Sequence, residues 1–311
     1  MTDWKYQKID LKYQLSDYTL FSVALPLQVA NSSFADSTTT LENIRPRTDR
    51  LSNECRGYLI RGLPIASGLP VITEHNGYLY YAPHQYNHYF IEMNTTFSDY
   101  SAKFSSKTRS TLKRKVRKYE KSCGGNIRWE TYSHPEHMRE FFRLAREVSV
   151  LTYQERLFDG GIPDSEPFIE NAIALAFEDQ IRAYILFDGD VPVSYLYCPV
   201  NKGVLTYAYL GYNPAYSKLS VGSVLQWLAL EQLFDESKFC YFDFTEGESP
   251  HKRLFATNHR HCANVYMFRN TLSNSALMRS HWCIERASRI LGSWAQSLGV
   301  KAKLRRLLRG Q

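Results

Sequence analysis

Residues 204 to 255 read VLTYAYLGYNPAYSKLSVGSVLQWLALEQLFDESKFCYFDFTEGESPHKRLF, and this stretch decides the fold. A period-two run of β-forming residues from 204 to 210 predicts a strand that ends at Gly211. A polar loop leads to Ser220, which is a good N-cap for a helix with an apolar face. A second apolar strand, KFCYFDF, follows and carries Asp243. The stretch therefore predicts strand, loop, helix, strand and turn in direct succession.

The start of the predicted helix is a candidate anion site. The first amides of a helix have no acceptor within the helix, and they lie at the positive end of its dipole. Gly222 falls in the first turn, where the missing side chain lets a ligand approach the backbone closely. Together these features favour a phosphate or a pyrophosphate at this helix start.

This order of elements resembles the acyl-CoA site of the GNAT superfamily of N-acyltransferases, and within it the CelD/BcsL-like branch, which is related to FemAB. In that branch a Ser-x-Gly helix start precedes a strand that reads roughly Asp-Phe-x-x-Gly-x-x-x-x-Lys. The matching residues here are Ser220, Gly222, Asp243, Phe244, Gly247 and Lys252. The basic run from 105 to 121 also looks like this branch. The chain departs from the wider superfamily in having a single Gly in its pyrophosphate loop, SKLSVGS.

The resemblance implies an α/β (α+β) fold, the GNAT acyl-CoA N-acyltransferase fold, with a mixed sheet flanked by helices. Residues 1–97 are strand-rich and include the hairpin signal Asn76-Gly77, so they are expected to form an N-terminal subdomain. Residues 98–270 are expected to form the GNAT core, and 271–311 a basic helical tail. Branch members often carry a degenerate second GNAT unit, and the strand-rich N-terminal half is a candidate for one.

The resemblance also implies acyl-CoA as the acyl donor. Backbone groups of the strand before the pyrophosphate loop would pair with the pantetheine chain, while the loop and helix start would bind the phosphates. A lysine can supplement them with a charge-assisted hydrogen bond. The expected cofactor-binding residues are Tyr209, Leu210, Gly211, Tyr212, Lys218, Ser220, Val221, Gly222, Ser223 and Lys252.

Acyl transfer to an amine needs a base and a proton donor for the departing thiolate. Asp243 is the candidate general base, because a carboxylate inside an apolar strand needs a partner. An anchoring role for Asp243 is an equally good interpretation, and Glu246, Glu248 or His251 could carry the proton instead. Tyr209 is the expected proton donor, with Tyr207 and Tyr212 as alternatives, although aromatic residues on a central strand are usually core.

Charge is unevenly distributed along the 311 residues, whose formal net charge is +7. Residues 103 to 121 carry a net +8 and residues 286 to 309 a net +7, so the remainder is mildly acidic. The first segment is expected to be a helix, begun by Ser105 or Ser106. If the protein is an acyl-CoA-dependent enzyme, Lys113, Arg114 and Lys118 of this helix are expected to lie outside the reacting centre. The positive charge of this segment is compatible with two alternative functions. One is a FemAB-like enzyme that takes aminoacyl groups from tRNA, and the other is a non-enzymatic nucleic-acid-binding protein. DNA is not an expected partner, and contact of the basic tail with an anionic membrane surface stays open.

Several other classes of function lack their signals. The six cysteines show no CxxC spacing, and neither His134-x-x-His137 nor the cluster of His259, His261 and Cys262 completes a zinc site, so no metal is expected. No leader or membrane-spanning run is recognisable, which predicts a cytoplasmic protein. The sequence therefore predicts an acyl-CoA-dependent N-acyltransferase. The acyl group could be a fatty chain, and the acceptor an amino sugar or the side-chain amine of Lys or ornithine in a small peptide.

Overall fold

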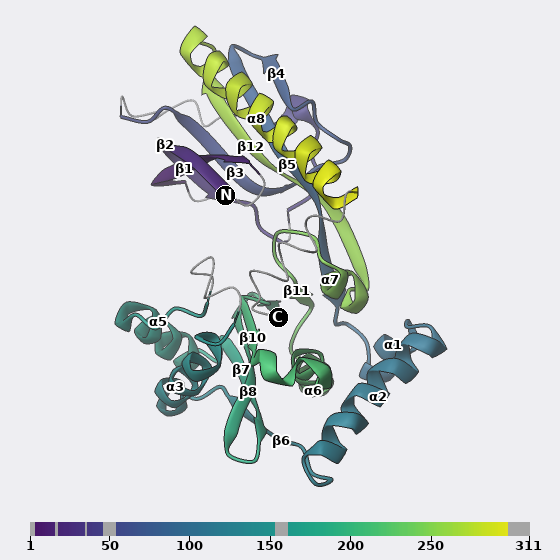
Figure 1. Cartoon of the computed structure of the whole chain (residues 1–311). Helices are drawn as coiled ribbons and strands as arrows, with labels where there is room; N and C mark the ends of the chain where they lie inside the picture. The colour runs from purple at the N-terminus through teal and green to yellow at the C-terminus, as the bar shows by residue number, and fades with distance from the viewer. Residues whose placement is uncertain (1–3, 16–17, 35, 46–53, 153–160, 298–311) are drawn as a thin grey trace. The chain divides into compact units, whose positions relative to one another are not determined.

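A computed structural model describes residues 4–15, 18–34, 36–45, 54–152 and 161–297. The chain divides into two compact units (Figure 1). Unit 1 contains Met1–Asn87 and Arg260–Gln311, and unit 2 contains His88–His259. The residues on either side of the central segment thus build unit 1 together. The division into domains after residues 97 and 270, which the sequence predicts, stays a prediction.

Unit 1 is a mixed sheet in the order β1, β2, β3, β12 and β5, and β4 pairs with β5. β2 and β3 run parallel, whereas β1 with β2, β3 with β12 and β4 with β5 are antiparallel. The strands are β1 (Lys5–Leu15), β2 (Tyr18–Asn31), β3 (Gly57–Pro64), β4 (Ile72–His75), β5 (Tyr78–Glu92) and β12 (Asn258–Arg269), and a short 3₁₀ helix, η1, spans Leu41–Asn43.

The long helix α8 (Leu272–Ser297) belongs to unit 1 (Figure 1). Its buried Met278 joins Leu25 and Leu27 of β2 in one apolar core, and the hydroxyl of Tyr13 donates to the Leu277 carbonyl at 3.2 Å. The helix expected from Leu272 onward is confirmed as far as Ser297. The rest of the expected basic tail, 298–311, lies outside the described residues. None of the described helices is both long enough and apolar enough to cross a membrane.

Unit 2 is a mixed sheet in which the end of β5 is followed by β11, β9, β8, β7 and β6. β10 pairs with β8 beside β9. The strands are β6 (Arg128–Tyr132), β7 (Ile181–Asp188), β8 (Val191–Asn201), β9 (Val204–Thr206), β10 (Tyr209–Tyr212) and β11 (Tyr241–Asp243). The helices are α1 (Phe97–Ala102), α2 (Ser106–Ser122), α3 (Met138–Ser149), α5 (Glu166–Phe177), α6 (Val221–Glu236) and α7 (Pro250–Phe255), with 3₁₀ turns η2 (Pro135–His137) and η3 (Pro214–Leu219).

Helices cover both faces of this sheet, because successive side chains along its strands point alternately into two apolar cores. Tyr184 and Leu186 of β7 point into the core formed with α2 and α6. Ala183 and Ile185 of the same strand point into the core formed with α3 and α5. The expected α/β fold with a mixed sheet flanked by helices is therefore confirmed.

The strands of unit 2 separate at one point. β9 runs parallel to β11, and the last link is the hydrogen bond from the Tyr207 amide to the Asp243 carbonyl, at 2.8 Å. Leu205 faces Val200 of β8, but Tyr209 faces Tyr197, so one extra residue is inserted between them. Such a bulge bends a strand. Beyond it β10 stays on β8 and leaves β11, which opens a wedge between two neighbouring strands.

Candidate active site

A pocket of about 610 Å³ lies beside this wedge. It is bounded by β10, the end of η3, the start of α6 and α7, all of which belong to unit 2. Nine of the residues expected from the sequence line it: Tyr209, Leu210, Tyr212, Ser220, Val221, Gly222, Ser223, His251 and Lys252. The fold thus gathers most of the predicted site in one cavity. Gly211, Lys218 and Asp243 do not line it.

The start of α6 presents free backbone donors to the pocket. Ser220 adopts the left-handed conformation, with φ 56° and ψ 38°, and its side chain makes no capping hydrogen bond. The expected N-cap role of its hydroxyl is therefore wrong, and the Ser220 carbonyl instead accepts from the amides of Ser223 and Val224. The amides of Val221 and Gly222 have no acceptor among the described residues. Two donors are left at the positive end of the helix dipole, as an anion site requires.

The packing around the site accounts for Gly222 and Gly211 in different ways. A Cβ on Gly222 would lie 3.2 Å from Leu210 Cδ2, the flexible end of a side chain, so Gly222 permits close packing of α6 on β10 beside the pocket. A Cβ on Gly211 would lie only 2.3 Å from Tyr195 Cε1. Tyr195 is buried, so Gly211 is required by the packing of β10 on β8. Its expected contact with the cofactor stays a prediction, outside the pocket lining.

Lysines from two elements, α2 and α7, lie beside the same helix start. Lys252 of α7 lines the pocket and donates to the Glu246 carbonyl at 2.6 Å. Lys115 of α2 has its Nζ 3.5 Å from Ser223 Oγ, and Lys118 donates to the Lys218 carbonyl at 2.8 Å. The Lys218 side chain is exposed and does not line the cavity. The expectation that Lys113, Arg114 and Lys118 lie outside the reacting centre stays a prediction, and Lys115 is a further cation of α2 that lies beside the start of α6.

His251 is held neutral in the pocket. Burial, followed by the charges of Lys115 and Lys252, lowers the pKa of His251 from 6.5 to about 4. Its Nε2 is hydrogen-bonded to Oε1 of Gln226, a fully buried residue of α6. Because an amide oxygen only accepts, Nε2 carries the proton, and Nδ1 keeps a lone pair. At neutral pH the ring is therefore uncharged. Its Nδ1 can accept a proton, while the proton on Nε2 is hydrogen-bonded to Gln226.

The low pKa of His251 predicts a pH dependence of stability. The unfolded chain binds a proton to this ring below about pH 6.5, whereas the folded chain does so only near pH 4, so stability falls as the pH falls between those values. We expect His251→Gln to remove about 2 kcal/mol of the stability lost between pH 7 and pH 4.5. Urea unfolding of both proteins at the two pH values measures the difference. Equal losses would show that the ring is not shielded from protons.

Asp243 lies at the point where the strands separate. Its Oδ1 accepts from the Thr245 amide at 2.7 Å and is paired with Nε2 of His88, the first residue of unit 2. Phe242 and Phe244 on either side point into the core with α6, so alternation places Asp243 on the opposite face of the sheet. Tyr209 packs on that opposite face against the core of α3 and α5. Asp243 and Tyr209 therefore flank the wedge from the same side.

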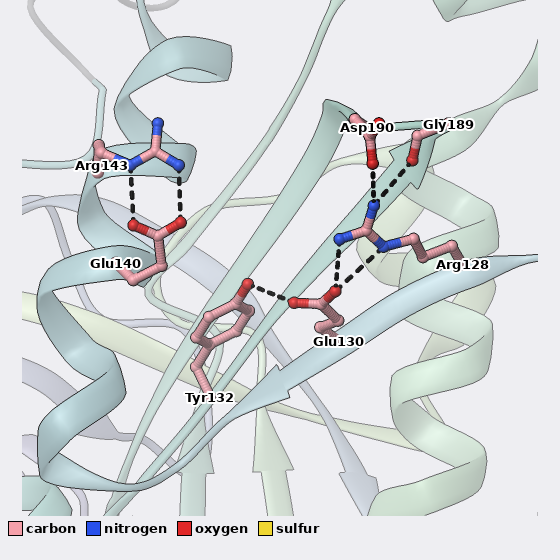
Figure 2. Close-up of polar contacts among 7 residues, drawn as sticks. All are labelled: Arg128, Glu130, Tyr132, Glu140, Arg143, Gly189 and Asp190. Carbon is pink, nitrogen blue, oxygen red and sulfur yellow. Dashed lines mark hydrogen bonds and ion pairs between the residues drawn. The ribbon is translucent and has the colours of Figure 1, made fainter.

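A second cavity of about 500 Å³ lies in unit 2 between β6 and α3. Its charged side chains satisfy one another (Figure 2). Arg128 donates to Glu130 at 2.9 Å and to Asp190 at 2.6 Å, and Arg143 donates to Glu140 at 2.6 Å. These arginines and carboxylates are already paired with one another, so this cavity is a weaker candidate site. Among the described residues no group of His, Cys, Asp and Glu is placed to hold a metal ion.

Sequence reasoning missed three residues of the site. His88 lies 155 positions before its partner Asp243, Gln226 lies on a helix face that reads as core, and Lys115 is one of nine cations in a run. No local pattern distinguishes His88 or Gln226. The run itself was the available signal for Lys115, since a cation that falls on the apolar side of its helix must face the protein.

Comparison with solved structures shows weak overall likeness. L-PGS from Bacillus licheniformis is 13% identical, with 73% of this chain and 72% of that chain covered and a TM-score of 0.47. FemX is 10% identical over 72% of this chain and 74% of its own, with a TM-score of 0.47. An aminoglycoside acetyltransferase from an uncultured soil metagenomic sample, solved with sisomicin, is 16% identical over 40% and 78%, with a TM-score of 0.30. None of the curated proteins matches the sequence.

The family comparison is more direct. Residues 106–253 match the family model described as "Acetyltransferase (GNAT) domain". The matched segment runs from α2 to α7 and contains the wedge, the pocket and the start of α6. The chain therefore carries a GNAT acetyltransferase domain over these residues. This match confirms the resemblance to the GNAT superfamily that the sequence showed, and the protein is an enzyme of the acyltransferase type.

Proposed function

We propose that this protein is an N-acyltransferase that uses acyl-CoA as its donor. The observation that carries the proposal is the coincidence of three features at one pocket: the wedge between β10 and β11, the free amides at the start of α6, and lysines that surround them. A donor with an extended amide-rich arm and a pyrophosphate needs all three. Strand edges pair with amides, and a helix start with nearby cations binds phosphate.

The donor then has a defined orientation. Its pyrophosphate lies at the amides of Val221 and Gly222, and its pantetheine arm follows β10 toward the wedge. The thioester lies where the Tyr207 amide makes the last link to β11. His251 lines the same pocket as a neutral ring, so it does not repel the lysines needed for the phosphates.

The acceptor approaches from the face that carries Asp243. The amine nitrogen attacks the thioester carbon and forms the new C–N bond, and the Asp243–His88 pair takes up the proton that the nitrogen loses. The C–S bond breaks as the tetrahedral intermediate collapses. The Tyr209 hydroxyl protonates the departing thiolate and is reprotonated from solvent. Burial raises the pKa of Tyr207, which disfavours the loss of its proton.

The acceptor belongs to the class of primary amines, either an amino sugar or the side-chain amine of Lys or ornithine in a small peptide. The site is rich in aromatic side chains, among them Tyr195, Tyr207 and Tyr209. Such side chains offer apolar surface with a polar tip, which suits a fatty acyl chain or a sugar ring. Mass spectrometry of molecules that co-purify with the protein would identify the acyl chain.

Calorimetric titration with CoA tests the donor. We expect the parent to bind CoA, and Gly222→Val to weaken that binding at least about tenfold, or about 1.4 kcal/mol, because the added methyl groups obstruct the phosphate approach. The variant should still fold, since the nearest neighbour of the new Cβ is the movable end of Leu210. Unchanged affinity in a folded variant would contradict this placement. If the parent does not bind CoA but transfers an aminoacyl group from tRNA, the donor is an aminoacyl-tRNA instead.

A further inference from the structure

Helix α2 carries its cations on two distinct faces. Leu112 and Tyr119 are buried against the sheet core, and the Tyr119 hydroxyl donates to the Phe187 carbonyl of β7 at 2.7 Å. These anchors fix which side chains face the protein. Lys115 lies three residues after Leu112 and four before Tyr119, so it shares their face and is half-buried. Lys113 and Arg117 are exposed.

Half-buried Lys115 and exposed Lys118, called the inner lysines because they contact α6 and η3, lie beside the donor pocket. Lys115 approaches Ser223 in the first turn of α6, across 108 positions of sequence. Lys118 binds the Lys218 carbonyl in η3, the segment that leads into the same turn. Lys252 of α7 lines the same pocket. Cations from α2 and α7 thus approach one helix start from two elements.

No carboxylate lies within 4.0 Å of the Nζ atoms of Lys115, Lys118 or Lys252 in the described part of the chain. The arginines of the second cavity are all paired, by contrast (Figure 2). Like charges held together cost free energy in a partly buried site unless a bound anion offsets them. The Asp243 and Glu246 carboxylates offset part of the charge of Lys252, and a polyanion in the pocket would offset the remaining positive charge.

We propose that Lys115 and Lys118 bind the phosphates of the acyl donor, which makes α2 a donor-binding element of the enzyme. The inference rests on the proposed function and adds to it the binding role of a helix that precedes the strand and loop of the motif. Lys115 meets the pyrophosphate beside Ser223, and Lys118 meets phosphate at the rim beside η3. Lys113 and Arg117 of the same helix have no part in donor binding.

A charge-matched pair of double variants tests the inference. Lys115→Gln with Lys118→Gln removes two inner charges, and Lys113→Gln with Arg117→Gln removes two outer ones. We expect the inner variant to bind CoA roughly thirtyfold more weakly than the parent, and the outer variant to stay within about twofold. The salt dependence of CoA affinity should also become shallower in the inner variant alone. Calorimetry at two salt concentrations measures both effects.

Pantetheine, which has no phosphate, separates phosphate binding from a structural role of Lys118 in the loop. Its affinity, followed by NMR titration, should be the same in the parent and in the inner variant. An equal loss for pantetheine and CoA would overturn the inference, as would an equal loss in the outer variant. A parent that binds CoA, together with an inner variant of unchanged affinity, overturns this inference alone. A parent that binds neither ligand overturns the proposed donor as well.

Discussion

Asp243→Asn lowers kcat by at least about a hundredfold and leaves CoA affinity near that of the parent, if the Asp243–His88 pair accepts the proton of the attacking amine. The substitution keeps the size of the side chain, and an amide oxygen still accepts from the Thr245 amide. It removes the negative charge that receives the proton. The loss should persist at saturating acceptor, because a missing base slows the chemical step rather than binding. Steady-state kinetics with a saturating amine measures it.

Two further variants make this result interpretable. Asp235→Asn makes the same chemical change at an exposed position of α6 and should leave kcat unchanged. His88→Gln should lower kcat as well, and the double variant should lose little more than either single one, because paired residues act as a unit. If the Asp243→Asn protein fails to fold, the role of Asp243 is to anchor strand β11 rather than to accept a proton. A folded variant with near-parental turnover would instead move the base to Glu246, Glu248, His251 or a water chain.

Gly211→Ala is expected to destabilise the protein by about 2 to 3 kcal/mol, because the new Cβ overlaps the buried ring of Tyr195. Two ring carbons and the hydroxyl oxygen of Tyr195 would lie 2.3 to 2.7 Å from the methyl group, and relief requires β10 to move away from β8. Such a shift would close the wedge in which the donor is proposed to bind. Urea unfolding and CoA titration of the same variant measure the two consequences.

A comparable glycine provides the control for this variant. Gly68 is exposed, and a Cβ there would meet nothing closer than Gln85 Oε1 at 3.8 Å, so Gly68→Ala should change stability by less than about 0.5 kcal/mol. Tyr195→Ala should remove the clash, which means that adding Gly211→Ala to it costs little more. If Gly211→Ala is as mild as Gly68→Ala, the packing of β10 on Tyr195 is not what requires glycine.

The sequence alone was sufficient for most features that depend on a few neighbouring residues, although the expected side-chain cap of Ser220 is absent. The period-two run from 204 and the helix after Ser220 are where the pattern places them, although the bulge divides the expected strand into β9 and β10. Asn76 and Gly77 both have positive φ in the two-residue turn from β4 to β5, as their dipeptide predicts. Ser105 caps α2 by accepting from the Thr108 amide. Side-chain shape, hydrogen-bonding groups and apolar spacing act over one or two turns, so these elements can be read directly.

Tertiary structure alone decided which side chains meet. His88 joins Asp243 because β5 lies beside β11, and Lys115 reaches Ser223 because buried Leu112 and Tyr119 orient α2 toward α6. The same packing made Gly211 a contact of Tyr195 and turned Ser220 into a left-handed link with no side-chain cap. Strand order and helix orientation are set by the burial of two whole faces of the sheet. A pairing between residues 108 or 155 positions apart has no local cause, and it exists only once that burial is complete.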